Sequence, residues 1–335
     1  MTGLGIGLRP MINRLRPAAS PVGRPARAPV GLALVAALVL ALAVAGCERD
    51  QPPAGPPQDP GRPTIRLASF DFPESELLGQ VYGQALGQHG FPVEQVVQLG
   101  SREVVAPALE QGKVDMVPEY LGSALNFLND RNRVATADPR QTHARLEQAF
   151  APRGVSVLAF APAVDRNGFV VSGDLARRHD LEKLSDLAPL ARQLVFGGPP
   201  ECPQRPLCLK GLQEVYRLSF ARFESMPSRA VTAAALETGE IDVGMIDTTD
   251  PSLLRPGADL VQLADDRRLQ PADNVVPVLR RELLDAYGPP LVSLVNAVSA
   301  QLTTVELTRL NLQVADGRPP ADAAAAWLRA HTIIG

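Results

Sequence analysis

Residues 101–115 read SREVVAPALEQGKVD, and residues 228–242 read SRAVTAAALETGEID. Ser, Arg, Val, the run Ala-Leu-Glu, Gly and Asp recur at identical offsets without a gap. Both segments have the pattern of a helix that begins after a capping Ser, ends at a Gly and leads into a strand. Their separation is too long for a solenoid period. The repeat therefore predicts two similar α/β lobes, and coincidence between two amphipathic helices is the weaker explanation.

The residues that flank the first copy alternate between strand and helix patterns. Residues 65–67 alternate apolar with polar side chains, and apolar residues recur at helical spacing over 77–86. Residues 93–97 and 114–117 have the pattern of further strands. This alternation is typical of a parallel sheet covered by helices. The tyrosines at positions 82, 216 and 287 fall on helical patterns and are expected in the core.

Four loops are expected to line one cleft between the lobes. In open parallel sheets, ligands bind beyond the carboxyl ends of the strands. The loops that leave the strands of each repeat copy span residues 116–123 and 243–250. The loops after the first strand of each lobe span residues 70–74 and 197–205.

The N-terminus has the pattern of an export signal. Residues 1–29 contain five Arg and no acid, and an apolar run over 30–45 ends in Ala-Gly-Cys47. The run is shorter than the ~20 residues of a stable membrane span. We expect a signal peptide over 1–46 and a Pro-rich spacer over 47–63, with a plain membrane anchor and an incidental Cys as the alternative.

Composition narrows the class of function. The chain has 335 residues with a net charge of -3, which argues against a nucleic-acid partner because such proteins usually carry a basic face. In an extracytoplasmic setting, Cys202 and Cys208 are expected to form a disulfide, and a metal pair or free thiols are the alternatives. The four His are scattered, so no metal or cofactor is expected.

The order of several motifs resembles the osmoprotectant branch of ABC-transporter substrate-binding proteins, the receptors for glycine betaine, choline and carnitine. The resemblance covers nearly all of the chain after the leader. It rests on these segments: Leu99-Gly100-Ser101-Arg102, Pro118-Glu119-Tyr120-x-Gly122, Ser185-Asp186-Leu187, Gly211-Leu212, Thr248-Thr249-Asp250, Leu263-x-Asp265-Asp266, Pro277-Val278 and Leu310-Asn311.

The resemblance implies an α/β, two-lobed periplasmic-binding-protein type II fold with a mainly parallel sheet in each lobe and hinge strands between them. Lobe 1 is expected over 64–160 and 264–335, and lobe 2 over 161–263. The implied protein is a monomeric receptor on the outer face of the cell membrane. It would carry a lipid on Cys47, bind a small zwitterion or cation, and deliver it to the permease and ATPase subunits of an importer.

Members of this family hold a quaternary ammonium group in a cage of aromatic rings, through cation–π attraction. Tyr120 occupies the position of a family cage tyrosine, and Phe169 lies near another cage position. Phe70 and Phe72 are further candidates for the walls. For Tyr120 and Phe169, packing in the core is the alternative to a role in the site.

Polar side chains are also expected to contact the ligand. Arg205 matches a family arginine, and a guanidinium grips a carboxylate with two parallel hydrogen bonds; a solvated surface position is its alternative. Ser123 falls where the family has a hydroxyl residue that could donate a second bond. Thr249 and Asp250 are expected either to face the cation or to set the conformation of their loop.

The sequence departs from the family pattern at two cage positions. Val117 and Ala272 stand where aromatic rings are common. This leaves room for a compatible solute that is bulkier or less cationic. An exported enzyme is a less favoured alternative, because the sequence has no Gly-x-Ser-x-Gly elbow and no His in a cleft loop. A sensory or scaffolding lipoprotein with the same fold is another.

Overall fold

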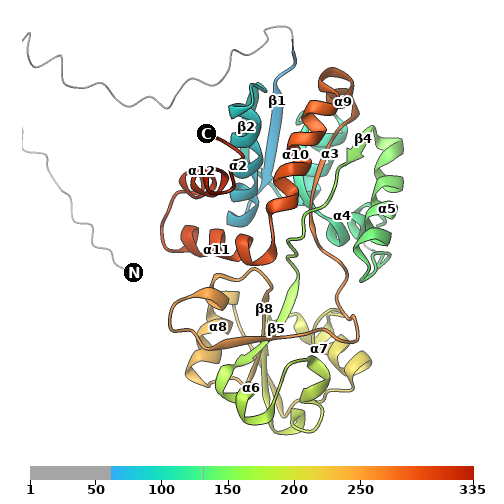
Figure 1. Ribbon diagram of the computed structural model, residues 1–335. Coiled ribbons are helices and arrows are strands. Elements are labelled where there is room, and N and C mark those ends of the chain that lie inside the picture. Colours follow the sequence, from blue (N-terminus) through green and yellow to red (C-terminus); the bar gives the residue numbers. More distant parts are fainter. Residues whose placement is uncertain (1–61, 131) are drawn as a thin grey trace, which may run out of the picture. The chain divides into compact units, whose positions relative to one another are not determined.

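A computed structural model describes residues 62–130 and 132–335 of the chain. The expected signal peptide, Cys47 and all but the last two residues of the expected spacer lie outside these described residues. Among the described helices, none combines the length and apolar character that crossing a membrane requires. The described part folds into two lobes, each built on a five-stranded sheet, and two chain segments join them (Figure 1).

The sheet of lobe 1 has the strand order β2-β1-β3-β10-β4. Strands β2, β1 and β3 are parallel to one another, whereas β10 runs antiparallel to both of its neighbours. The strands are β1 (Ile65–Phe70), β2 (Val93–Gly100), β3 (Met116–Tyr120), β4 (Val155–Val157) and β10 (Val275–Arg280). The helices around them are α2 (Pro73–Gln88), α3 (Arg102–Glu110), α4 (Leu121–Leu128), α5 (Pro139–Phe150), η1 (Ala151–Arg153), α9 (Arg281–Tyr287), α10 (Pro289–Gln301), α11 (Thr304–Ala315) and α12 (Pro320–Ala330).

The sheet of lobe 2 repeats this arrangement with the order β7-β6-β8-β5-β9. Here β5 is the strand that runs antiparallel to its neighbours. The strands are β5 (Asn167–Ser172), β6 (Val195–Gly198), β7 (Arg222–Ser225), β8 (Val243–Asp247) and β9 (Leu260–Leu263). The helices and short helical turns are α6 (Gly173–His179), η2 (Leu184–Leu187), η3 (Ala191–Gln193), η4 (Cys202–Gln204), α7 (Leu209–Gly211), η5 (Leu212–Tyr216), α8 (Arg229–Thr238) and η6 (Pro251–Leu254).

The internal repeat forms equivalent elements in the two lobes. Its copies become α3 with β3 and α8 with β8. The last Asp of each copy accepts a hydrogen bond from the first strand of its lobe. Asp115 accepts from the backbone nitrogen of Arg66 on β1, at 3.0 Å, and Asp242 accepts from the backbone nitrogen of Val195 on β6, at 2.8 Å. The prediction of two similar α/β lobes is thus confirmed, although both sheets are mixed rather than mainly parallel. The antiparallel strands β10 and β5 each follow a crossing from the other lobe.

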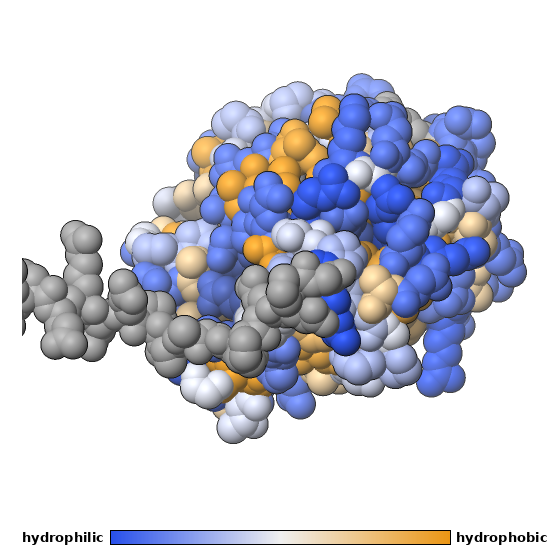
Figure 2. Space-filling model, turned by 90° about the horizontal axis from the view of Figure 1, so that it is seen from above, coloured by the Kyte–Doolittle hydropathy of each residue, from blue (hydrophilic) through white to orange (hydrophobic). Residues whose placement is uncertain are grey.

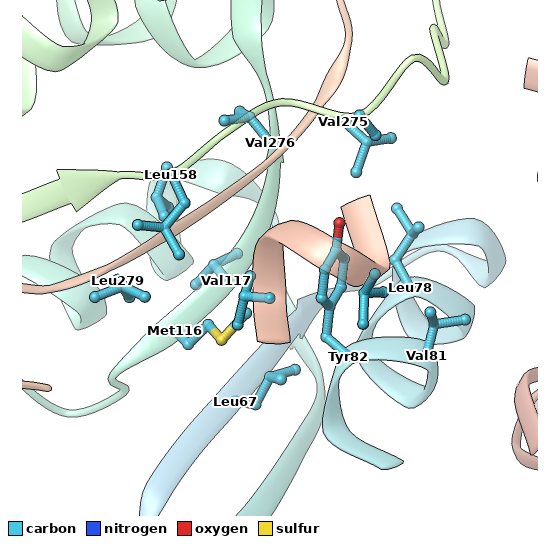
Figure 3. Close-up of a cluster of buried hydrophobic side chains, with 14 of the residues drawn as sticks. Leu67, Leu78, Val81, Tyr82, Met116, Val117, Leu158, Val275, Val276 and Leu279 are labelled. Atoms are coloured by element: carbon cyan, nitrogen blue, oxygen red, sulfur yellow. The ribbon is translucent and has the colours of Figure 1, made fainter. Parts of the chain in front are cut away.

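Each lobe has its own apolar core. Tyr82 is fully buried in lobe 1, where its hydroxyl lies 3.0 Å from the hydroxyl of Ser299 on α10. Figure 3 shows it among aliphatic side chains from α2, β1, β3 and β10. Tyr216 and Tyr287 are also buried, which confirms the expectation for all three tyrosines. The face seen in Figure 2 is mostly hydrophilic around a smaller hydrophobic area, as expected for a covered core.

The chain crosses between the lobes twice, and hydrogen bonds connect the two crossing segments. The first lies between β4 and β5; the second follows β9 and ends at β10. Leu269 still packs in the lobe 2 core, so the return falls between Leu269 and Val275, just after the sequence-based boundary at 263/264. The guanidinium of Arg166 donates to the backbone oxygen of Pro271 at 3.2 Å. The backbone nitrogen of Asp165 donates to the backbone oxygen of Asp273 at 3.1 Å.

Candidate functional site

Three adjoining cavities form a cleft lined by both lobes. The first, of about 560 Å³, is called the aromatic cavity and is lined by Phe70, Asp71, Phe72, Ser101, Arg102, Glu103, Ser123, Asn126, Phe127 and Arg205. The second, of about 450 Å³, is called the arginine cavity and is lined mainly by lobe 2, including Arg205, Arg229 and Asn167, with Asn126 and Arg133 from lobe 1. The third, of about 410 Å³, is called the acidic cavity and includes Phe72, Glu74, Asp165, Asp247, Thr249, Asp250 and Asn311.

Shared side chains make these cavities one site. Asn126 and Arg205 line both the aromatic and the arginine cavity, and Phe72 lines both the aromatic and the acidic cavity. An ion pair between Nε of Arg229 and Oδ1 of Asp247, at 3.1 Å, connects the arginine cavity with the acidic cavity. The cleft is therefore continuous. Arg205 lines its aromatic and arginine cavities, Glu74 and Asp165 line its acidic cavity, and the Arg229–Asp247 pair lies where the arginine and acidic cavities meet.

Three aromatic rings lie in a row along lobe 1. The ring centroids of Phe70 and Phe72 are 5.9 Å apart, and those of Phe72 and Tyr120 are 6.1 Å apart. Phe70 is buried, and the guanidinium carbon of Arg102 lies 5.0 Å from its ring centroid. Phe72 is 37% exposed and is the ring most open to the cleft. The structure thus brings together Phe70, Phe72 and Tyr120, as the sequence predicts for a wall of rings.

The end of β3 is held by a network of buried polar groups. The hydroxyl of Tyr120 donates to Oε1 of Glu74 at 2.7 Å. Glu119 forms a bidentate pair with Arg102, with both nitrogen–oxygen distances at 2.9 Å. A charge-assisted, bidentate pair of this kind fixes the relative orientation of its two side chains and also stabilises the fold. The ring of Tyr120 is therefore held in place behind Phe72, and Tyr120 itself is buried and is not among the residues that line the three cavities.

Ser123 has its hydroxyl hydrogen engaged within the protein. Its Oγ donates to Oδ2 of Asp273 at 2.7 Å, and the backbone nitrogens of Gly122 and Ser123 both donate to Oδ1 of Asp273 at 2.9 Å. Burial raises the pKa of Asp273 to about 6, and the hydrogen bonds from Ser123 oppose this rise. Ser123 lines the aromatic cavity, yet a ligand would meet a hydroxyl whose hydrogen is already donated.

Arg205 lies in a loop clamped at both ends. Cys202 and Cys208 form a disulfide, so the expected bridge is present. The backbone nitrogen of Arg205 donates to the oxygen of Cys202, and that of Cys208 donates to the oxygen of Arg205, both at 3.1 Å. The Arg205 side chain is exposed and lines two of the three cavities. It is placed to receive an anionic group in the cleft.

The other three predicted residues have mixed placements. Phe169 is buried in the core of lobe 2 beside Phe196, with ring centroids 6.2 Å apart, and does not line any of the three cavities. Thr249 and Asp250 line the acidic cavity. Asp250 accepts hydrogen bonds from the backbone nitrogen and the hydroxyl of Ser252, so it caps η6 and sets its own loop.

Besides Asp250, the acidic cavity contains three carboxyl groups that the sequence did not single out, those of Glu74, Asp165 and Asp247. Burial raises the pKa of Glu74, of Asp247, and of Asp165, the last to about 9. For Asp165, the neighbouring carboxyls of Glu74 and Asp247 add to the effect of burial. Its Oδ1 is buried without a hydrogen-bond partner among the described residues. A cationic group in this cavity would favour the ionised forms, because an opposite charge nearby stabilises them.

A signal for Asp247 was present in the repeat. Counted from the first Ser of each copy, Tyr120 and Asp247 occupy the same position. Tyr120 ends β3, and Asp247 ends the equivalent strand β8. Glu74 falls within the loop 70–74 that is expected to line the cleft, but the residue itself was not singled out, because an acid in the first turn of a helix is explained by the helix dipole alone. Within residues 62–130 and 132–335, no group of three or more His, Cys, Asp and Glu is placed to hold a metal ion.

A family model and several known proteins match most of this chain. The family model described as the substrate binding domain of ABC-type glycine betaine transport system matches residues 63–330. The glycine betaine-binding protein YehZ of Escherichia coli K12 is 30% identical over 279 residues, which cover 79% of this chain and 90% of that protein. The carnitine transport binding protein OpuCC of Listeria monocytogenes is 25% identical over 262 residues, covering 76% and 82%.

A solved structure shares the fold. The crystal structure of a glycine betaine/carnitine/choline ABC transporter component superposes with a TM-score of 0.74. Its sequence is 22% identical, and the match covers 81% of this chain and 99% of the other. At this level of identity the likeness concerns the two-lobed fold alone.

Proposed function

Because this chain belongs to the family of substrate-binding domains of ABC-type glycine betaine transport systems, we propose that it captures a small zwitterionic osmoprotectant in the interlobe cleft. The family consists of solute-binding components of ABC importers, so the expectation of a binding protein rather than an enzyme is confirmed. We further propose that the protein is a monomer anchored through Cys47 on the outer face of the membrane. It would deliver the ligand from there to a permease with its ATPase.

The observation that carries this proposal is the separation of charge along one continuous cleft. Arg205 lines the aromatic and arginine cavities, whereas Glu74 and Asp165 line the acidic cavity. Arg229 and Asp247 pair with each other where the arginine and acidic cavities meet. A zwitterion such as a betaine has its carboxylate and its cation at opposite ends. Phe72, which lines both the aromatic and the acidic cavity and packs on Tyr120, supplies an aromatic face between them, and each favourable cation–π contact is worth about 0.5–2 kcal/mol.

The proposal is tested by titrating the protein calorimetrically with glycine betaine, carnitine, choline, proline and ectoine. Saturable binding of at least one of them is expected. Glycine betaine and choline form an informative pair, because both carry a trimethylammonium group and only glycine betaine has a carboxylate. A protein that binds none of the five would contradict the proposal.

Two variants locate the ends of the ligand. Arg205→Ala is expected to weaken glycine betaine binding by about 1–3 kcal/mol and to leave choline binding nearly unchanged, since the lost bond is charge-assisted. Tyr120→Ala is expected to weaken both ligands by about 1–3 kcal/mol, and Tyr120→Phe, which keeps a ring, should retain more affinity.

The matched control for Arg205 is Arg192→Ala. Arg192 is an exposed arginine in η3 of lobe 2 and is not among the residues that line the three cavities. This control should bind both ligands as the wild type does. Equal losses of choline and glycine betaine binding in Arg205→Ala would show that Arg205 does not hold the carboxylate.

A further inference from the structure

We propose that Asn311 is the positioning residue that couples occupancy of the cleft to the contact between the two lobes. The inference rests on the proposed function, because the coupling it describes is that of a binding protein that closes on its ligand. Asn311 touches both lobes and lines one wall of the acidic cavity.

Asn311 belongs to lobe 1 but faces lobe 2. It lies on α11, whose Leu307 and Leu310 are buried in the core of lobe 1. The same helix packs against η6 of lobe 2. In Figure 1, α11 is the lobe 1 helix nearest to the loops of lobe 2 on its side of the molecule. The helix therefore carries Asn311 at the contact between the lobes.

One amide group bridges the lobes. Nδ2 of Asn311 donates to Oε2 of Glu74 in lobe 1 at 2.5 Å and to the backbone oxygen of Thr249 in lobe 2 at 3.0 Å. Both acceptors belong to buried residues. Removing a donor from buried acceptors costs more than a surface contact does, because the acceptors are left unsatisfied.

The bridge continues to a predicted ligand-binding ring. Glu74 accepts from the Tyr120 hydroxyl with its other carboxyl oxygen, at 2.7 Å. Tyr120, Glu74, Asn311 and Thr249 thus form a chain of hydrogen bonds from the ring row to the loop after β8. Glu74, Asn311 and Thr249 also line the acidic cavity, so an occupant of that cavity would touch the chain from both lobes.

A second tie across the same contact offers a matched control. Arg255 of lobe 2 pairs with Asp316 of lobe 1 at 3.3 Å, and both side chains are about half exposed. Exposed ion pairs contribute little. Arg255→Ala therefore removes an interlobe contact next to η6 without touching the cleft.

The test combines binding with amide hydrogen exchange on the full chain. In the ligand-free protein, Asn311→Ala should speed exchange across residues 247–254, whereas Arg255→Ala should not. Asn311→Ala should weaken glycine betaine binding roughly tenfold or more, and Arg255→Ala by about twofold or less. Asn311→Gln, which keeps the amide donors, should recover part of the affinity.

A double-mutant cycle tests the chain of bonds. Asn311→Ala and Tyr120→Phe each remove one donor to Glu74, so their combined effect on affinity should differ from the product of the separate fold-changes. Unchanged exchange over 247–254 in Asn311→Ala, or equal effects of Asn311→Ala and Arg255→Ala, would overturn the inference. If the wild type binds none of the solutes, the proposed function fails, while exchange in the ligand-free protein still decides whether Asn311 bridges the lobes.

Discussion

Single residues decide the chemical character of the cleft. Tyr120 and Asp247 lie at the same offset from the first Ser of their repeat copies, so β3 ends in a ring where β8 ends in a carboxyl group. Val117 and Ala272 are buried, and the rings that line the aromatic cavity are those of Phe70, Phe72 and Phe127. The acidic cavity is bordered by the ring of Phe72 and by carboxyl groups.

The carboxyl group of Asp165 makes stability depend on pH. Its pKa rises from the ordinary value of 3.8 to about 9, first through burial and then through Glu74 and Asp247. The folded state therefore binds more protons than the unfolded state between these pH values. The contribution of protonated Asp165 to the free energy of unfolding is therefore fully present below about pH 4, and it is lost as the pH rises towards 9.

Asp165→Asn should remove this dependence, because an amide does not ionise. The free energy of unfolding of the ligand-free protein, measured by urea denaturation, should decrease from pH 5 to pH 9 by a smaller amount in the variant than in the wild type. The two decreases should differ by on the order of 1–3 kcal/mol. Asp322→Asn, an exposed substitution in the first turn of α12, should keep the wild-type slope. Parallel pH profiles for wild type and Asp165→Asn would contradict the argument.

Residue-level prediction from the sequence succeeded where a strand end or a motif marked the position. Arg205 was singled out in this way and lines two of the three cavities, whereas Tyr120 is buried beside Phe72 and is not among the residues that line them. Asp165 was not predicted, because it lies in the first crossing between the lobes, outside the four expected cleft loops. Phe169 lies in β5, and the direction of its side chain, into the lobe 2 core, depends on which face of β5 is covered.

The disulfide loop between Cys202 and Cys208 is expected to affect the stability of the fold and the binding of ligand in separable ways. Cys202 and Cys208 are six positions apart, so the bridge closes a short loop. Constraint of such a loop contributes about 2 kcal/mol to stability in the chain-entropy model. The same loop carries Arg205, which faces the cleft.

The variant with both Cys202→Ser and Cys208→Ser should separate these effects. Its free energy of unfolding should fall by about 2 kcal/mol. Glycine betaine binding should weaken, because Arg205 loses its preorganised position, whereas choline binding should change little. Calorimetry of both ligands measures the difference, and a parallel loss of the two affinities would argue that the loop supports the whole cleft instead.

The elements of the first lobe were the most predictable from sequence. The patterns over 65–67, 77–86, 93–97 and 101–110 correspond to β1, α2, β2 and α3. The antiparallel strands β5 and β10 were not foreseen. Each pairs with a strand that is distant in sequence, after the chain has crossed from the other lobe. Local periodicity predicts a strand but does not predict whether that strand pairs parallel or antiparallel.

At the scale of the whole molecule, the proposed anchor is separable from the binding site. Cys47 precedes the described residues, and every residue that lines the cleft lies at or after Phe70. Cys47→Ala should therefore move the protein from the membrane fraction to the soluble fraction, with glycine betaine affinity within about twofold of the wild type. Fractionation followed by calorimetry provides the measurement. Membrane retention of Cys47→Ala would contradict lipidation at this residue.

Lobe 2 is an insertion into lobe 1, since the chain enters it after β4 and returns to β10, and both β1 and α12 belong to lobe 1. With the proposed lipid on Cys47, upstream of β1, the membrane linkage would enter the fold through lobe 1 and leave lobe 2 untethered. A rotation of lobe 2 that traps a solute would then put no load on that linkage. A permease that contacts both lobes would detect cargo through the position of lobe 2 relative to lobe 1.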